Sequence, residues 1–454
     1  MEALRGGIIM KTAFGKGIKF ITGTMVIPML LGGCSFVKDN GSGKDTNNGS
    51  PGSYELKSDP AVKADIEFDD VKGAQYDVEL MDSAYRKYCL DLFSQTVKDY
   101  DGDGNVMISP ASVMIALDMT AAGAKGNSLK QLTDLFAPGQ EPLIQQAYAA
   151  ALMDKINSSK NVDFTCANAV WNNESRLGDK VNTDYVDYIK DTFLAEYIVT
   201  DFEEKTVDEI NSWVDSKTDH MISKVIDMLD PDAVMVLVNA ICFDGEWIVP
   251  YEEGNVREGD FTSYDGTVKK AMFLHDASGS YYETDKATGF IKHYKGGQYA
   301  FLAILPKDET ISANEFSKSF TAQDYEDFIG SVTGGYQVIS KMPEFQSDFD
   351  ILMNDTIAEL GADSIFNFET ADFSGIAKNP GDISISRIIH KTHIEVDRKG
   401  TRASAVTAIE ATEACVEETE VPEYRYVECD RPFVYAIVDS RTMAPVFIGT
   451  VNEV

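Results

Sequence analysis

The sequence predicts a mixed α+β fold in one large body. Helical and strand-like segments alternate along the chain, but without the regular strand–helix–strand order of a parallel sheet. The clearest helical patterns lie before residue 123, and two strand-like runs lie close to the C-terminal end. At 44% hydrophobic residues, the 454-residue chain can bury a sizeable core, which excludes a disordered or fibrous protein.

Two helices are predicted at the start of this body. Residues 82–98 follow a candidate cap at Asp82 and place six side chains on one face at helical spacing. These are Tyr85, Tyr88, Cys89, Leu92, Phe93 and Val97. Ser109 and Pro110 then supply a cap and a first-turn proline for a second helix over residues 111–122. This helix is apolar nearly all round, so we expect it to be buried.

Four strands are expected farther along the chain. Residues 234–243 form an almost continuous apolar run, typical of a strand covered on both faces, and Asn239 interrupts it. A buried amide without partners costs about 1–3 kcal/mol, so Asn239 predicts an internal hydrogen-bond network. Residues 299–305, 433–439 and 446–451 are also predicted strands, and the last two are predicted to form a C-terminal hairpin.

A fifth strand is predicted at residues 388–396, where His390 shares one face with apolar and small side chains. That face consists of Ile388, His390, Thr392, Ile394 and Val396. A lone histidine on such a face is more often a hydrogen-bonded core residue than a catalytic one. We therefore predict a structural role for His390.

A segment with little apolar bulk follows this strand. Residues 398–408 are mostly small, and residues 409–430 carry eight acidic side chains against the single base Arg425. Such a segment cannot pack as an ordinary core strand, and its second half is charged enough to be exposed. The plainest interpretation is a long solvated loop.

The N-terminus is predicted to be a targeting segment. Three lysines precede an uncharged stretch at residues 20–33, which is too short for a membrane span of roughly 20 residues but suits a signal-peptide core. The stretch ends in Leu-Gly-Gly-Cys34, which resembles a bacterial lipobox, so Cys34 is the predicted lipidation site. An ordinary secretory signal is the alternative. We expect a signal peptide at 1–33, a lipidated flexible tether at 34–74 and a folded domain at 75–454.

Composition excludes several classes of partner and activity. The chain has 40 basic and 74 acidic side chains, a net charge of −34, so nucleic acid is an unsuitable partner. The six cysteines lie far apart, without the spacing of a disulfide scaffold or metal site. Residues 101–105 imitate the opening of a calcium loop, but Val106 replaces its required glycine. Hydrolase, metalloprotease and nucleotide-binding motifs are absent. We therefore expect no enzyme, metal or cofactor.

Several motifs, in order, resemble those of the serpin family. They are the segments 105–112, 123–126, 210–214 and 238–247, the glycine-threonine pair at 400–401, and 431–433. The resemblance covers roughly residues 76–454. It implies one α+β domain with three β-sheets, about nine helices and an exposed reactive-centre loop. It further implies that Ser109, Ser112, Asn239 and His390 form a polar cluster beneath the opening point of the main sheet, with Trp247 near its top.

The family mechanism implied by this resemblance is suicide inhibition of a serine protease. The protease attacks the loop and forms an acyl-enzyme, and insertion of the cleaved loop into the main sheet traps it. The expected hinge starts at Gly400. Its inward positions would be Thr401, Ala403, Ala405 and Thr407, all small, whereas Arg402, Ser404 and Val406 would face outward. This pattern is compatible with insertion.

Two features depart from the family pattern. The family usually has Glu at the positions of Arg398 and, often, Arg402, so insertion is slower here or the charge partner of Arg398 is inverted. The segment 400–432 is also longer than usual, which leaves the scissile bond open. Counting from the hinge places it at Ala414-Cys415, which suits an elastase-like or subtilisin-like protease. Counting back from residue 431 moves the bond toward Val421, and an acid before the bond would imply a glutamate-specific protease.

These expectations define the partners and location. The predicted partner is a target serine protease, the membrane is contacted only through the lipid anchor, and the protein is expected to be a monomer. It would be exported and either anchored at a bacterial cell surface or secreted. The alternative function is that of a non-inhibitory serpin acting as a surface binding protein or a substrate decoy for proteases.

Overall fold

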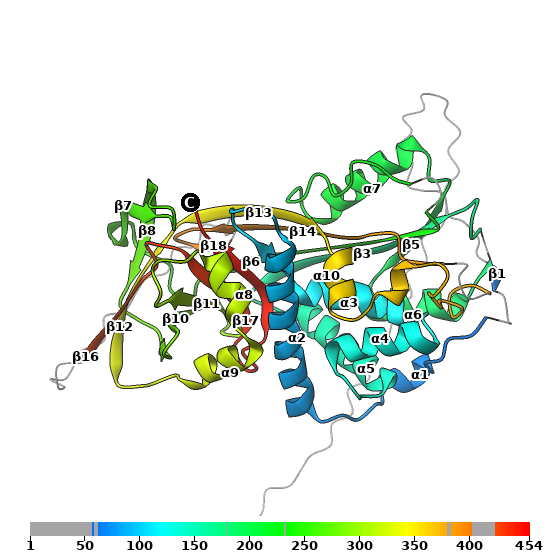
Figure 1. Cartoon of the computed structure of the whole chain (residues 1–454), viewed down its shortest axis with the longest axis horizontal. Helices are drawn as coiled ribbons and strands as arrows, with labels where there is room; N and C mark the ends of the chain where they lie inside the picture. Colours follow the sequence, from blue (N-terminus) through cyan, green and yellow to red (C-terminus); the bar gives the residue numbers. More distant parts are fainter. Residues whose placement is uncertain (1–56, 59–61, 179, 231–232, 379–382, 402–422) are drawn as a thin grey trace, which may run out of the picture. The chain divides into compact units, whose positions relative to one another are not determined.

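The computed structural model describes residues 57–58, 62–178, 180–230, 233–378, 383–401 and 423–454 (Figure 1). The described part contains ten α-helices and eighteen strands. The helices are α1 Phe68–Val71, α2 Val78–Asp99, α3 Pro110–Ala121, α4 Gly126–Phe136, α5 Pro142–Asn157, α6 Thr183–Phe193, α7 Glu204–Lys217, α8 Ala313–Ser319, α9 Ala322–Gly330 and α10 Asn354–Glu359, with short 3-10 helices at Glu253–Asn255 and Ser364–Phe366.

A six-stranded sheet, here called the main sheet, has the strand order β13-β14-β15-β6-β3-β5. Its strands are β3 Asp163–Asn173, β5 Glu196–Thr200, β6 Met235–Glu246, β13 Phe345–Leu352, β14 Ile388–Val396 and β15 Gly400–Thr401. Strand β6 is antiparallel to β3 along ten residue pairs, from Asp163–Asp244 to Asn172–Met235. This long ladder forms one half of the sheet, and β13 with β14 forms the other half.

Two further sheets complete the fold. A six-stranded sheet has the order β2-β18-β17-β11-β10-β9, and a four-stranded sheet has the order β16-β12-β8-β7. The strands are β2 Met107–Ile108, β7 Val256–Thr262, β8 Val268–Asp276, β9 Tyr281–Glu283, β10 Ala287–His293, β11 Tyr299–Pro306, β12 Tyr336–Pro343, β16 Glu423–Glu428, β17 Phe433–Asp439 and β18 Pro445–Val451. Short strands β1 Lys57–Ser58 and β4 Lys180–Val181 pair separately. The predicted α+β fold with three main sheets is confirmed, and β17 and β18 form the predicted hairpin.

Helix α3 links the main sheet to the second sheet. Every residue from Pro110 to Ala121 is buried, as its apolar sequence predicted, and the helix packs against both β6 and β18. The large core surrounds α3, and a smaller apolar cluster lies beneath α7 on β3 and β6. The N-terminal end of α3 therefore lies next to the centre of the main sheet.

Two predicted boundaries are corrected. The first helix begins at Val78 with Asp77 as its cap, whereas the predicted cap Asp82 is buried inside the helix and accepts a hydrogen bond from Tyr148. The folded body also extends N-terminal to residue 75. Val62, Ile66 and Val71 are buried, so a flexible tether as far as residue 74 is wrong for residues 62–74. Apolar side chains within this otherwise charged stretch provide the packing.

Candidate functional site: the hinge and the opening of the main sheet

The site centres on β15, which lies between β14 and β6. Thr401 is paired with Val396 of β14 on one side and with Gly245 of β6 on the other. At the opposite end of β14, Ile388 pairs directly and in parallel with Leu237 of β6. The two central strands of the main sheet therefore contact each other at one end and hold the start of the hinge between them at the other.

Residue 400 must be a glycine because its Cα lies very close to the backbone of β6. A Cβ added to Gly400 would lie 2.1 Å from the carbonyl oxygen of Gly245 and 2.8 Å from the Cα of Glu246. Both neighbours are backbone atoms of β6 and cannot rotate away. A side chain at residue 400 would push the hinge out of the sheet.

A tight turn feeds the hinge into the sheet. Asp397 Oδ1 accepts the backbone N–H groups of Lys399 and Gly400 at 2.7 Å and 3.0 Å. The backbone N–H of Asp397 in turn donates to the carbonyl of Gly400 at 2.9 Å. This side-chain bridge reverses the chain between β14 and β15 and fixes where the hinge enters. Asp397 was not predicted from the sequence.

Thr401 is buried at the end of this turn, and its hydroxyl forms a 2.5 Å hydrogen bond with that of Tyr294. The ring of Tyr294 stacks on the indole of Trp247, with 4.5 Å between ring centroids and a 15° interplanar angle. Trp247 Nε1 donates to the carbonyl of Asp397 at 3.0 Å. Burial raises the pKa of Tyr294 well above its usual range, so its hydroxyl stays neutral. Trp247 thus supports the top of the sheet through the turn and through Tyr294.

Four of the predicted cluster residues meet deeper in the sheet. Ser109 caps α3, donates its backbone N–H to His390 Nε2 at 2.9 Å, and donates its hydroxyl to the carbonyl of Val446 at 2.8 Å. Ser112 donates its hydroxyl to Asn239 Oδ1. These contacts join the N-terminal end of α3 to β14 through His390 and to β6 through Asn239, which are the two strands that the hinge separates.

One member of this network was missed by the sequence analysis. Asn239 Nδ2 donates to Asn168 Oδ1 of β3 at 2.5 Å, and Asn168 Nδ2 donates to the carbonyl of Phe193 at 2.7 Å. Asn168 and Asn239 lie opposite each other in the ladder of β3 and β6. The buried amides therefore satisfy each other across the sheet, as the interruption of the apolar run at Asn239 had suggested.

His390 is held neutral. It is 2% exposed, and burial lowers its pKa from 6.5 to about 3. Because Nε2 accepts the backbone N–H of Ser109, the neutral ring carries its proton on Nδ1. His390 acts as a hydrogen-bond acceptor that ties the start of α3 to β14, which is a structural role.

An acidic side chain faces the backbone at Arg398. Glu344, between β12 and β13, accepts the backbone N–H of Arg398 at its Oε1 at 3.2 Å. Burial raises the pKa of Glu344, and the hydrogen bond from the backbone N–H of Arg398 opposes that rise. The nearby charges have smaller effects: Asp397 raises this pKa and Arg398 lowers it. The basic residue at the entrance of the hinge therefore has an acidic neighbour from a different part of the fold.

Comparison with known proteins identifies the family. The family model described as "Serpin (serine protease inhibitor)" matches residues 83–454. The chain belongs to the serpin family. Serpins are not enzymes, so the chain is not an enzyme.

The matches to related proteins and solved structures cover most of the chain. An uncharacterized serpin-like protein of Methanosarcina mazei is 28% identical over 396 residues, which is 85% of this chain and 89% of the relative. Iripin-5 of Ixodes ricinus is 31% identical, covering 77% of this chain and 89% of that protein. The native structure of the thermophilic serpin tengpin is 34% identical, covers 87% of this chain and all of that chain, and gives a TM-score of 0.75. Tengpin in its latent state gives 0.70.

The remaining predicted serpin sites lie outside the described residues. They are Arg402, Ala403, Ser404, Ala405, Val406 and Thr407 of the hinge, the predicted reactive bond Ala414-Cys415, and Cys34. The described residues include no group of three or more metal-binding side chains suitably placed for an ion. None of the described helices is long and apolar enough to cross a membrane.

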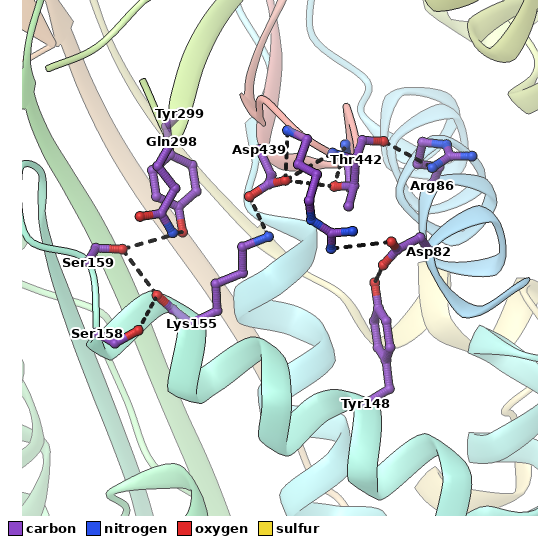
Figure 2. Close-up of polar contacts among 12 residues, drawn as sticks. Asp82, Arg86, Tyr148, Lys155, Ser158, Ser159, Gln298, Tyr299, Asp439 and Thr442 are labelled. Atoms are coloured by element: carbon purple, nitrogen blue, oxygen red, sulfur yellow. Dashed lines mark hydrogen bonds and ion pairs between the residues drawn. The ribbon is translucent and has the colours of Figure 1, made fainter. Parts of the chain in front are cut away.

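A second polar cluster, also missed from sequence, joins α2 and α5 to the turn between β17 and β18 (Figure 2). Asp82 of α2 accepts the Tyr148 hydroxyl of α5 at 3.0 Å and lies 3.5 Å from the guanidinium of Arg441. Lys155 of α5 forms an ion pair with Asp439, at the end of β17. The polar groups of this cluster satisfy one another, so it holds two helices against the second sheet of the serpin.

Proposed function

We propose that this serpin inhibits serine proteases by a suicide mechanism. The target cleaves the reactive-centre loop and forms an acyl-enzyme, and the loop then inserts as a new strand of the main sheet. The observation that carries the proposal is the position of Gly400 and Thr401 between β14 and β6. The hinge already occupies the entrance of the gap that the rest of the loop must enter.

The composition of the hinge supports full insertion. Ala403, Ala405 and Thr407 continue the alternation that starts with the buried Thr401, and each is small enough to enter a packed sheet. A strand of a dozen or so residues would gain on the order of ten ladder hydrogen bonds, each about 1 kcal/mol net. Such a gain, about 10 kcal/mol, is comparable to the whole free energy of unfolding of a typical protein, which is about 5–15 kcal/mol.

The neighbourhood of Arg398 favours an inhibitor over a non-inhibitory serpin. A second base near Arg398 would repel it and destabilise the turn that leads into the hinge. The neighbouring side chain is instead the acid Glu344. We infer that the charge pair at the entrance is inverted in this chain. The alternative is a non-inhibitory serpin that acts as a surface binding protein or a protease decoy. Neither role requires the loop to insert into the main sheet.

The proposed targets are elastase-like or subtilisin-like proteases, which accept a small residue before the scissile bond at Ala414-Cys415. Trypsin-like enzymes are disfavoured because no Lys or Arg lies between Arg402 and Arg425. Cleavage after Glu417 or Glu418 would instead indicate a glutamate-specific protease. The mass of the released C-terminal peptide distinguishes these possibilities directly.

We further propose that the protein is exported and carries a lipid on Cys34. The uncharged stretch before Cys34 supports this, as does the polar composition of residues 38–53, which contain no large apolar side chain and suit a spacer between membrane and body. An anchored inhibitor would act on proteases that approach a bacterial cell surface.

The experiment that tests the inhibitory function is incubation with an elastase-like protease followed by denaturing electrophoresis and intact mass measurement. We expect a species that survives denaturation, with a mass equal to that of the protease plus the serpin minus the released peptide. A pure cleavage product that lacks both the complex and any gain in heat stability would favour the decoy.

A further inference from the structure

Three helices meet around the fully buried carboxyl group of Asp118. This residue lies on α3, and its Oδ1 accepts hydrogen bonds from Nε2 of Gln145 at 2.6 Å and Nε2 of Gln146 at 3.0 Å, both on α5. Tyr188 of α6 donates its hydroxyl to Gln146 Oε1 at 2.9 Å. Asp118 therefore anchors a network that connects α3, α5 and α6.

Two acceptor atoms of this network have no hydrogen-bond partner among the residues that the structure describes. They are Asp118 Oδ2 and Gln145 Oε1, and both are buried away from solvent. Among the described residues, no cation forms an ion pair with Asp118 or lowers its pKa. A buried carboxylate with a bare oxygen and no counter-charge is strongly unfavourable, as is a bare amide carbonyl beside it.

In the described part of the chain, the titratable side chains that interact with Asp118 are phenols. Tyr88 approaches it from α2 and Tyr188 from α6, and burial is the main reason that the pKa of each is raised. Both phenols therefore stay neutral and supply no positive charge. The neighbours from α5 are the uncharged amides Gln145 and Gln146. Burial accordingly raises the pKa of Asp118 well above its usual range, and the hydrogen bond from Gln145 opposes this only in part.

We propose that Asp118 is a neutral carboxylic acid in the native protein and that its Oδ2–H donates to Gln145 Oε1. A proton on Oδ2 turns one unpartnered acceptor into a donor for the other. The Nε2 of the same amide already donates to Oδ1, so the added bond closes a cyclic acid–amide pair. One proton thus satisfies both orphaned atoms.

The proposal makes the contact between α3 and α5 dependent on a proton. Helix α3 also carries Ser109 and Ser112, which hold the two central strands of the main sheet. An unfolded aspartate ionises at about pH 3.9, so above that pH the chain takes up this proton on folding. Each rise of one pH unit then increases the unfolding equilibrium constant up to about tenfold, until the raised pKa of the folded state is reached.

Infrared spectroscopy of the full chain labelled with carboxyl-¹³C aspartate tests the protonation state directly. At neutral pH we expect a carbonyl band of a protonated aspartic acid in the wild type, lost in Asp118→Asn. Labelling aspartate alone keeps Glu344, whose pKa is also raised, out of the spectrum. A wild-type spectrum without a protonated aspartic acid band at neutral pH would overturn the proposal.

Stability measurements provide a second test with a matched pair of variants. Asp118→Asn keeps the ring, because its N–H donates to Gln145 Oε1 and its carbonyl still accepts, but it cannot titrate. Asp118→Leu has a similar volume and no hydrogen bonds.

We expect the ratio of wild-type to Asn unfolding constants to rise with pH from about pH 5 upward, by up to tenfold per unit, until the pKa of the folded state is reached. We also expect Asp118→Leu to be less stable than Asp118→Asn throughout. A ratio that does not change with pH would contradict the proposal, and the wild-type infrared spectrum decides the matter if Asp118→Asn does not fold.

Discussion

The hydroxyl groups of Thr401 and Tyr294 lie 2.5 Å apart, so the first inward residue of the hinge is bonded to a core side chain in the native serpin. Tyr294 stacks on Trp247, which also holds the turn that delivers the hinge. The start of the loop is therefore fixed inside the main sheet. Below it, the cluster of Ser109, Ser112, Asn239 and His390 joins β14 and β6, the two strands that the proposed insertion would separate.

Thr401→Arg is expected to convert the inhibitor into a substrate. Because Thr401 already lies between β6 and β14, an unpaired guanidinium there, which costs several kcal/mol to bury, should displace the start of the hinge from the sheet and oppose its return during insertion after cleavage. The measurement is the number of serpin molecules consumed for each protease molecule inhibited, which should rise at least tenfold. Ser404→Arg is the matched control, because residue 404 is predicted to face outward and its variant should retain inhibition. Unchanged inhibition by Thr401→Arg would contradict insertion.

The pair of Arg398 and Glu344 is expected to show charge coupling. Arg398→Glu alone places two acids together and Glu344→Lys alone places two bases together, so each should destabilise the native hinge and shorten the half-life of the active form at elevated temperature. The double variant restores opposite charges but not the acceptor for the backbone N–H of residue 398, so it should recover only the electrostatic part of the loss. A double-mutant cycle measures the coupling, expected at about 0.5–1 kcal/mol for a partly buried pair. Additive losses would mean that the two charges do not interact.

His390 is expected to make the native protein less stable in acid. The folded-state pKa of about 3 lies below the usual 6.5, so the unfolded chain binds a proton that the folded chain does not. The stabilisation is fully present above about pH 6.5 and is lost as pH falls toward 3, at up to about 1.4 kcal/mol per pH unit. The unfolding midpoint against pH should have a shallower acid slope in His390→Gln. An identical slope in the two proteins would show that a group other than His390 causes the loss of stability at low pH.

Cys34→Ala is expected to release the protein from membranes. The prediction follows from the proposed lipid on Cys34, since an unlipidated polar segment has no affinity for a bilayer. Membrane and soluble fractions of cells that express the wild type or the variant provide the measurement. Persistence of the variant in the membrane fraction after a high-salt wash would argue against the lipid anchor.

The sequence predicted those parts of the site that depend on periodicity. Alternation in 388–396 placed His390 inward, and the interruption of an apolar run placed Asn239 in a buried network. Partners brought together only by folding were missed. Asn168 lies in a strand whose pattern does not mark it, and Asp397 acts through a turn that forms only when β15 enters the sheet.

Boundaries were the least predictable feature. Asp82 has the residue type of a helix cap, but Asp77 takes that position, and Asp82 instead bonds Tyr148 and Arg441 across two other elements. Residues 62–74 have too few apolar side chains to indicate a folded segment by themselves. They are nevertheless packed, because the body offers a surface for Val62, Ile66 and Val71 that a sequence pattern does not reveal.

The most direct test of insertion uses the body, residues 53–454, which is the compact unit that contains all the described residues. Its heat stability is measured before and after reaction with an elastase-like protease, on the same samples as the covalent complex. The packed segment 62–74 is retained in this body. We predict a complex that resists denaturation, release of a peptide that begins at Cys415, and a large rise in the melting temperature of the cleaved serpin. Cleavage in the loop with neither a covalent complex nor a rise in melting temperature would contradict the account.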